Sequence, residues 1–472
     1  MSLDTLQVDV YQLTTLLAHA DAGRLHHAEE MAVFFRRLPT QRNYVVFCGL
    51  RSILEHAAGM RFSHDELETL RHHPTVGPAL KARPAVERAL QELDGFVGEI
   101  DSLPEGTLAF AGPGRRTDGR ALEVAGAPLQ LYTPLMQVRT DLVRAKLLET
   151  PWLSRINHQA MVASKAARVV TAARDKTVLE FGSRRTHPLA SIDASYAAYI
   201  GGCVSTSNFA ALHKWGIPAT GTMDHFYVQA AEQEGRSPSD TEREAFATFA
   251  QAFPDAAILL IDTYDTERGI ANAVAATNGK LAGIRIDSNV NPTTVARARQ
   301  QLAELGAPHA KIFVSDGLDE VKVTELRDLV DGFGVGERIT TSPDAATGVG
   351  AVAKLIVHGY GKITMKVAKG SGKATLPGRL QVWRYRDHDL IALADEGTPA
   401  GGHELLRPVW RQRAASPLPT ASESRQFVRD QIAGLPPSLR ELDVSKTPWP
   451  LVASDGLVER IESLVEAAGV SS

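Results

Sequence analysis

Polar side chains follow six apolar, β-branched runs in the middle of the chain, and side chains of these types bind anions and move protons. Helical segments separate the runs, which recur about every 25–40 residues, and this alternation predicts strand–helix units in a parallel sheet or barrel. The carboxyl ends of such strands open onto one face, where the chemistry of these folds collects. We therefore predict an enzyme with its site at these ends. The runs are TVLEFGSRR (177–185), TGTMDH (220–225), ILLIDTYD (258–265), GIRIDS (283–288), KIFVSDG (311–317) and RITTSPD (338–344).

His225 ends one predicted strand and directly precedes an amphipathic helix. The pKa of histidine lies near neutral pH, so His225 is suited to act as a nucleophile or as a general acid and base. Asp224 either orients this histidine or caps the following helix. In the second case His225 is a solvated residue of the first helical turn, and the tripeptide alone leaves both interpretations open.

Arginines end two of the other runs. Arg184 and Arg185 follow the first run, and Arg285 lies at the end of another. Arginine holds a phosphate or carboxylate with two parallel hydrogen bonds, which lysine cannot reproduce. One of two adjacent arginines is often only solvated, but together with Arg285 the pair indicates an anionic substrate.

Three strand-end aspartates, Asp262, Asp265 and Asp287, suggest a second kind of chemistry. Carboxylates bind ribose hydroxyls, and they bind waters of Mg²⁺, which prefers oxygen ligands shared with substrate phosphates. Capping of the following helix explains strand-end aspartates equally well. We expect capping for at least one of the three.

Glycines form turns that suit phosphate binding in GFGVGERITTS (332–342) and SDG (315–317). Backbone N–H groups approach a phosphate closely at such turns, although plain chain reversal needs the same glycines. A lysine-bearing stretch, KGSGKATLPGRLQVWR (369–384), either closes over phosphates or forms a solvated hairpin.

Composition excludes several classes of protein. The 472 residues carry a net charge of −4, so no overall basic field recruits nucleic acid or anionic membrane. Cys48 and Cys203 form neither a disulfide framework nor a CxxC metal motif, which indicates a reducing cytoplasm. We expect no signal peptide and no membrane span, because neither a basic-then-apolar leader nor a long uncharged run is present.

The changing rhythm of the sequence predicts the domain organisation. Short strands and Gly/Pro turns at 108–132 suggest a boundary near 130, and periodic helices follow at 157–174 and 292–305. We predict an N-terminal domain over 1–130, a catalytic α/β domain over 131–375, and a C-terminal segment over 376–472.

The order of several motifs resembles that of one enzyme family over nearly the full chain. This family is the nicotinate phosphoribosyltransferases, and no single motif but the whole series carries the resemblance. The motifs are DVYQLT (9–14), FFRRLP (34–39), GL (49–50), LEFGSRR (179–185), AAYIGG and TSN (within 197–208), GIPATGTMDH (216–225), LLIDTYDT (259–266), GIRIDS (283–288), FGVG (333–336) and KATLPGRLQVWR (373–384).

The resemblance implies an irregular α/β barrel and a second α/β sandwich domain in which the C-terminal segment packs on the N-terminal one. It implies transfer of phosphoribose from phosphoribosyl pyrophosphate to nicotinate, with substrate-associated Mg²⁺ and no dedicated protein metal site. ATP hydrolysis is coupled through a phosphorylated histidine. A homodimer with shared active sites is expected.

The resemblance also assigns roles to residues of this chain. His225 matches the phosphorylated histidine, Arg285 and Thr222 the nicotinate pocket, and Asp287 the region of ribose and pyrophosphate. Tyr11 matches the aromatic residue that stacks on the pyridine ring in the neighbouring subunit. The remaining substrate-binding residues that it implies are Phe181, Arg184, Ser207, Asp262, Ser315, Asp316, Gly334 and Gly336.

Two alternatives accompany this prediction. The first is a phosphoribosyltransferase for nicotinamide or for a related pyridine or quinolinate. Related nicotinamide enzymes carry an acidic residue where this chain has Ser207, which favours a carboxylate base over nicotinamide. The second alternative is a silent nucleotide-binding homologue, suggested by departures from the family pattern. Those departures are the VSTSN segment (204–208) in place of GTSN, Asp224, Asn289-Val290 in place of Gly-Asp, and Glu337 in place of a threonine.

Overall fold

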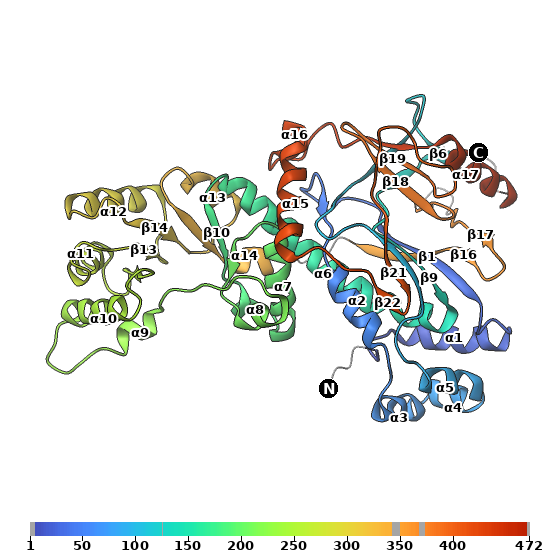
Figure 1. The fold of residues 1–472 in the computed structure, drawn as a ribbon, viewed down its shortest axis with the longest axis horizontal. Coiled ribbons are helices and arrows are strands. Elements are labelled where there is room, and N and C mark those ends of the chain that lie inside the picture. The colour runs from blue at the N-terminus through green and yellow to red at the C-terminus, as the bar shows by residue number, and fades with distance from the viewer. Residues whose placement is uncertain (1–4, 125, 342–349, 368–372, 470–472) are drawn as a thin grey trace. The chain divides into compact units, whose positions relative to one another are not determined.

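The computed structural model describes residues 5–124, 126–341, 350–367 and 373–469. The chain forms two compact units: a central unit, Val162–Ala346, and a terminal unit that combines Met1–Met161 with Thr347–Ser472. The divisions differ from the predicted boundaries near 130 and 375. Helix α6 (Leu142–Ala173) continues through the first division, so no turn marks it in the sequence (Figure 1).

The central unit is built on a six-stranded parallel sheet in the order β11-β10-β15-β14-β13-β12. This α/β sheet confirms the predicted fold class, and its strands form an open half-barrel rather than a closed ring among the described residues. The strands are β10 (Thr177–Glu180), β11 (Ser205–Thr206), β12 (Ile258–Leu260), β13 (Gly283–Ile286), β14 (Lys311–Val314) and β15 (Gly332–Val335).

Four of the six predicted strands are present, and two predictions are wrong. Residues 220–225 form no strand, and 338–341 belong to helix α14 (Glu337–Thr340) and its end, while 342–344 lie outside the described residues. The strand lies instead in the preceding glycine-rich stretch, as β15. A side chain at Gly334 would come within 2.4 Å of the Phe181 ring, so this glycine permits close packing inside a strand rather than a turn.

Helices connect the central strands, as Figure 1 shows for α10 to α13. Asp265 caps α11 by accepting a hydrogen bond from the backbone N–H of Arg268, which confirms that one of the three strand-end aspartates is a cap. The helices are α7 (Pro188–Ile200), α8 (Phe209–Trp215), α9 (His225–Gln229), α10 (Pro238–Ala252), α11 (Thr266–Ala276), α12 (Pro292–Glu304) and α13 (Glu320–Leu326), with a 3₁₀ turn at Ser183–Arg185.

The terminal unit contains two larger sheets. The first has the order β17-β16-β1-β9-β3-β21-β22, from β17 (Lys362–Ile363), β16 (Ala351–His358), β1 (Ala28–Phe35), β9 (Met136–Asp141), β3 (Gly98–Ser102), β21 (Arg407–Gln412) and β22 (Ala414–Ala415). The second has the order β20-β18-β19-β23-β5-β8, from β20 (His403–Glu404), β18 (Leu380–Arg384), β19 (Asp389–Leu393), β23 (Leu451–Ala453), β5 (Ala111–Arg116) and β8 (Gln130–Tyr132). Strands from both ends of the chain thus share each sheet.

Short elements and helices complete the terminal unit. The pairs β2 (Val45–Val46) with β4 (Leu108–Ala109), and β6 (Glu123–Val124) with β7 (Ala127–Pro128), form two small sheets. The helices are α1 (Val10–Asp21), α2 (Leu50–Gly59), α3 (His64–His72), α4 (Val76–Lys81), α5 (Pro84–Gln91), α15 (Ala421–Gly434), α16 (Pro437–Arg440) and α17 (Asp455–Ala467). Within the described ranges, no helix combines the length and apolarity that a membrane crossing requires.

Candidate active site

Hydrogen bonds join three neighbouring strand ends of the central sheet. The Ser315 hydroxyl, after β14, donates to Asp287 Oδ1 at 2.7 Å, after β13. The backbone N–H of Asp287 donates in turn to Asp262 Oδ2 at 2.8 Å, after β12. Because the strands are parallel and adjacent, the predicted residues meet at the carboxyl ends of the strands.

Arg285 reaches from β13 to the segment that was predicted as a strand. Its guanidinium donates to the Thr222 hydroxyl at 2.6 Å, and it lies 3.9 Å from Asp287 Oδ2. The backbone N–H of Thr220 donates to the carbonyl of Thr206, in β11. The 220–225 segment therefore runs from the outer strand β11 to Arg285 in β13.

His225 begins α9 and lies in the same group of residues. Its Nδ1 is 3.1 Å from the Thr263 hydroxyl, and its Nε2 is 3.8 Å from Asp287 Oδ2. Asp224 is the helix cap, since its carboxylate accepts from the backbone N–H of Tyr227. The capping interpretation is therefore confirmed for Asp224, whereas His225 contacts the cluster and is not merely solvated. The sequence had not singled out Thr263, although it directly follows Asp262.

Two buried polar atoms of this cluster have no hydrogen-bond partner among the described residues: Asp262 Oδ1 and Arg285 Nε. Burial raises the pKa of Asp262, although the backbone N–H of Asp287 and the charge of His225 oppose the rise. Burial likewise lowers the pKa of Arg285, more than the attraction of Asp287 and Asp262 raises it. Buried polar groups without partners are rare in proteins, and here they lie where a polar ligand would complete them.

A buried carboxylate beneath the first strand end was also missed from the sequence. Glu180 ends β10 and accepts hydrogen bonds from the Thr206 hydroxyl at 2.6 Å, from the Ser195 hydroxyl at 2.9 Å, and from the backbone N–H of Gly182. It thereby ties the loop after β10 to β11 and α7. Burial raises the pKa of Glu180. The only sign of Glu180's role in the sequence is that it directly follows two apolar residues, in VLE (178–180).

The loop after β10 carries Phe181 and Arg184. Phe181 packs on Gly334, and its backbone N–H donates to the carbonyl of Val335 at 2.9 Å, so the predicted glycine and aromatic residues are neighbours. Arg184 is exposed, and its positive charge contributes to lowering the pKa of Arg285. Ser207 is exposed after edge strand β11, with three strands between β11 and β13.

The remaining phosphate-binding candidates lie at the turns after β14 and β15. Asp316 is half-buried, and its carbonyl accepts from Lys322 Nζ at 3.2 Å, which brings a cation to this turn that the sequence had not indicated. Gly336 precedes α14 and packs against the Phe181 carbonyl. Glu337 is exposed and lies 3.8 Å from Arg185 Nε, so a cation lies beside its charge.

The Asn289 departure has a simple backbone explanation. Asn289 has a φ of 53°, in the left-handed region that favours glycine. Asparagine is the residue that adopts this conformation most readily after glycine, so it can replace the expected glycine without changing the turn. Val290 is buried, and Asn291 caps the following helix.

Tyr11 belongs to the terminal unit, in the first turn of α1, and half of its surface is exposed. The Glu149 carboxylate lies close enough to add to the effect of burial, which raises the pKa of Tyr11. An exposed aromatic ring beside a carboxylate is available to stack on a planar ligand.

Within the described residues, no group of three or more His, Cys, Asp or Glu side chains could hold a metal ion by itself. Asp262 and Asp287 nevertheless provide oxygen donors, one of them with an unpartnered buried oxygen. This donor set fits Mg²⁺ held jointly by one or two carboxylates and substrate oxygens.

Comparison with known proteins decides the family. The chain matches the N-terminal domain of nicotinate phosphoribosyltransferase over residues 6–111 and the C-terminal domain of quinolinate phosphoribosyl transferase over 162–345. It is 39% identical to nicotinate phosphoribosyltransferase pncB1 of Mycobacterium tuberculosis, covering 91% of each chain. The chain belongs to the nicotinate phosphoribosyltransferase family. The resemblance seen in the sequence motifs is thus confirmed.

Further members of this family agree over the whole chain. Nicotinate phosphoribosyltransferase pncB2 of Mycobacterium tuberculosis is 32% identical and covers 98% of this chain and 94% of its own length. The crystal structure of human nicotinic acid phosphoribosyltransferase superposes with a TM-score of 0.79 at 26% identity, covering 98% of this chain and 99% of that one. The match therefore includes both units and not only the central sheet.

Proposed function

We propose that this enzyme transfers the phosphoribosyl group of phosphoribosyl pyrophosphate to nicotinate, forming nicotinate mononucleotide and pyrophosphate for NAD biosynthesis. The observation that carries the proposal is the group formed by Arg285, Thr222, Asp287 and Asp262, which includes two unpartnered buried atoms in a chain of this family. Its relatives are named as nicotinate phosphoribosyltransferases, which supports this substrate and product class.

Arg285 is proposed to bind the carboxylate of the base. Its Nε is buried without a partner among the described residues, while its NH1 is already held by Thr222. A guanidinium fixed in this way presents a donor to a carboxylate without further ordering. Nicotinate supplies the negative charge that nicotinamide lacks, so Arg285 favours the acid.

The carboxylates are proposed to act on the ribose side of the reaction. The pyridine nitrogen attacks C1′ as the bond from C1′ to the pyrophosphate oxygen breaks, and positive charge develops on the ribose ring. Asp287, which Ser315 holds by a hydrogen bond, would stabilise that charge or bind the ribose hydroxyls. The turn at Ser315 and Asp316, with Lys322 beside it, is proposed to bind the 5′-phosphate together with the end of β15 at Gly334 and Gly336.

Asp262 and Asp287 would hold substrate-associated Mg²⁺, which would supply positive charge to the leaving pyrophosphate. Arginines of the central unit would also offset the negative charge of the leaving pyrophosphate. Arg184 is exposed in the loop after β10, where its guanidinium is free to bind pyrophosphate oxygens.

His225 is proposed to couple ATP hydrolysis to the transfer by accepting a phosphoryl group. The imidazole nitrogen would attack the γ-phosphorus of ATP, ADP would leave, and water would later release the phosphate. The contact of Nδ1 with Thr263 orients the ring, and Nε2 points toward Asp287. The phosphorylated ring would then lie beside the pyrophosphate site.

Tyr11 supports a homodimer with shared sites. This exposed ring lies in the terminal unit. The strand-end cluster, by which we mean Asp262, Arg285, Asp287 and Ser315, lies in the central unit. We propose that Tyr11 stacks on the base bound by a second copy of the chain. Cys48 and Cys203 are buried thiols that form no disulfide among the described residues, which is in keeping with a cytoplasmic enzyme.

Turnover with phosphoribosyl pyrophosphate and either nicotinate or nicotinamide, with and without ATP, tests the proposal. We expect nicotinate mononucleotide, detected by mass spectrometry, with nicotinate at least tenfold preferred and ATP raising the rate. No product with either base would overturn the proposal and favour a silent nucleotide-binding homologue. A preference for nicotinamide would overturn the assignment of the base.

The role of His225 has a separate test. His225→Ala should retain basal transfer and lose the ATP-dependent increase, while His213→Ala, an exposed histidine of α8, should retain both. ATP stimulation that survives in His225→Ala contradicts the phosphohistidine.

A further inference from the structure

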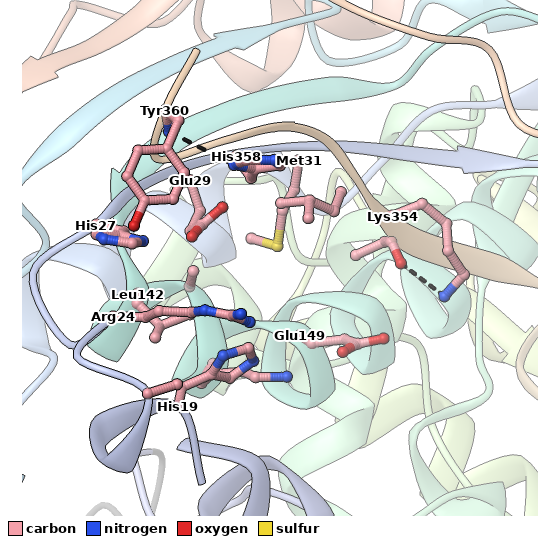
Figure 2. Close-up of a pocket in the computed structure, with 15 residues that line it drawn as sticks. His19, Arg24, His27, Glu29, Met31, Leu142, Glu149, Lys354, His358 and Tyr360 are labelled. Atoms are coloured by element: carbon pink, nitrogen blue, oxygen red, sulfur yellow. Dashed lines mark hydrogen bonds between the residues drawn. The ribbon is translucent and has the colours of Figure 1, made fainter. Parts of the chain in front are cut away.

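A cavity of about 490 Å³ lies within the terminal unit, apart from the residues assigned to the reaction above. Helices α1 and α6 form one side, and strands β1 and β16 form the other. Figure 2 shows Glu29 and Met31 above the cavity, Arg24 and His19 below it, and Glu149 and Lys354 at one end. The volume is within the range of small-molecule sites, about 300–1,000 Å³.

More cationic than anionic side chains line the cavity. Arg24 and Lys146 line it, and among the described residues neither the Arg24 guanidinium nor the Lys146 ammonium group has an ion-pair or hydrogen-bond partner. Within the described ranges, Lys354 Nζ donates only to the backbone carbonyl of Ala353. Burial lowers the pKa of Lys146, and the attraction of Glu149 does not offset it. An anion bound between these groups would restore the missing interactions.

The lining acids do not supply that anion. Glu149 already accepts a hydrogen bond from the Gln12 amide at 3.4 Å. Glu29 is only 7% exposed, and burial raises its pKa, although the charges of His358, His27 and Arg24 oppose the rise. Arg24, Lys146 and Lys354 outnumber Glu29 and Glu149, the two acids that line the cavity, and a bound anion would balance the remaining positive charge.

Glu29 also points to a second feature of the ligand. Its Oε2 is buried without a hydrogen-bond partner in the part of the chain that the structure describes. In Figure 2 the carboxyl group lies over the cavity, near the ring of Tyr360. A ligand hydroxyl would satisfy this oxygen in either protonation state, because a hydroxyl both donates and accepts.

We propose that this cavity is a second ligand site that binds a small phosphate ester bearing a free hydroxyl. The phosphate lies between Arg24 and Lys146, and the hydroxyl bonds to Glu29. The apolar side chains of Met31 and Leu142 cover the carbon skeleton. No residue that lines the cavity is assigned a role in the transferase reaction above, although Glu149 lies beside Tyr11.

Calorimetric titration of the full chain with glycerol 3-phosphate tests the site, with inorganic phosphate and glycerol as comparison probes. We expect saturable binding of glycerol 3-phosphate, weaker binding of phosphate and none of glycerol. Arg285→Gln, which alters the strand-end cluster of the central unit, should leave this binding intact. No saturable binding below about 10 mM, a free energy of roughly −3 kcal/mol, overturns the proposal.

Matched variants locate the site. Replacing Arg24 and Lys146 with glutamine should weaken binding at least tenfold, whereas replacing the exposed Lys81 and Arg88 of the same unit removes the same charge and should not. Glu29→Gln should reduce the preference for glycerol 3-phosphate over phosphate. Equal losses in the matched pair would mean a nonspecific charge effect and overturn the proposal.

Hydrogen–deuterium exchange on the unmodified protein provides a readout that needs no variant. Added glycerol 3-phosphate should slow exchange in residues 24–31 and 142–149, which line the cavity. Slowing confined to residues 285–287 and 315–317 would place the probe in the strand-end cluster and overturn the second site.

Discussion

Glu180 in the central unit and Glu29 in the terminal unit are both buried glutamates, but their surroundings differ. Glu180 accepts from two hydroxyls and a backbone N–H, so its carboxylate has the partners it needs inside the fold. Glu29 has one oxygen without a partner among the described residues and lines a cavity. Burial raises the pKa of both. A shifted pKa alone therefore does not distinguish a structural acid from a ligand-binding one; the hydrogen-bond partners do.

The same distinction applies within the strand-end cluster. Ser315 and Asp287 satisfy each other, whereas Asp262 Oδ1 and Arg285 Nε are buried without partners in the described structure. The cluster thus contains both a hydrogen-bonded pair of side chains and buried polar atoms that a ligand could bind. The cavity around Glu29 contains an unpartnered buried oxygen, but that oxygen has no such hydrogen-bonded pair beside it.

The largest expected effect comes from Arg285→Gln. Loss of the charge that binds the base carboxylate should reduce kcat/KM for nicotinate about 100- to 1,000-fold, as for other preorganised charged contacts. Steady-state kinetics measure the loss, and Arg88→Gln, on the surface of α5, serves as the control. A reduction below tenfold would mean that Arg285 does not contact the base.

Tyr11→Ala should raise the KM for nicotinate about tenfold, the equivalent of ~1.4 kcal/mol of lost stacking, and change kcat little. Purified heterodimers of one Tyr11→Ala subunit and one Arg285→Gln subunit then test sharing of sites. If Tyr11 acts in the partner's site, one intact site forms and the wild-type KM returns. A raised KM in these heterodimers means that Tyr11 acts within its own subunit.

The two glutamates should respond to substitution with opposite signs. At pH 7.5, Glu180→Gln should lower the stability by about 1 kcal/mol, because the backbone N–H of Gly182 loses its acceptor when the glutamine oxygen keeps the two hydroxyls. Glu29→Gln should raise the stability slightly by removing an acid with an unpartnered oxygen. Thermal unfolding measures both. The same sign for the two variants would remove the distinction drawn between them.

These variants also carry a pH dependence. An acid whose pKa is raised in the folded state binds its proton more tightly there than in the unfolded chain. Its contribution to the free energy of unfolding is therefore complete below 4.5, the ordinary pKa of glutamate, and is lost as the pH rises through the folded pKa. Glutamine has no such proton. The Tm of each variant relative to wild type should therefore increase from pH 4.5 to pH 8, and constant differences would contradict the raised pKa values.

The smallest expected effect is at Asn289. Asn289→Gly should leave stability within about 0.5 kcal/mol, since both residues adopt a positive φ, whereas Asn289→Ala should cost about 1 kcal/mol. Chemical denaturation measures both. An alanine variant as stable as wild type would show that this turn does not constrain the loop after Asp287.

Much of the site was predictable because it follows strand ends. Asp262, Asp287 and Ser315 stand directly after apolar β-branched runs, and Arg285 lies near the end of one. Parallel pairing brings such positions together whatever the intervening helices. The failures have a common cause. Residues 220–225 resemble a strand locally but run from β11 to Arg285, and β15 resembled a turn because its glycines make room for Phe181.

The sequence by itself determined the order of the strands' polar endings, the family and the residues of the strand-end cluster, since these depend on local pattern and parallel pairing. Only the tertiary structure decided which polar atoms lack partners. The partners of Glu180 come from residues 182–206, and the cavity around Glu29 draws on residues from 19 to 360. Burial and hydrogen bonding at such positions depend on segments distant in the chain, which no local pattern encodes.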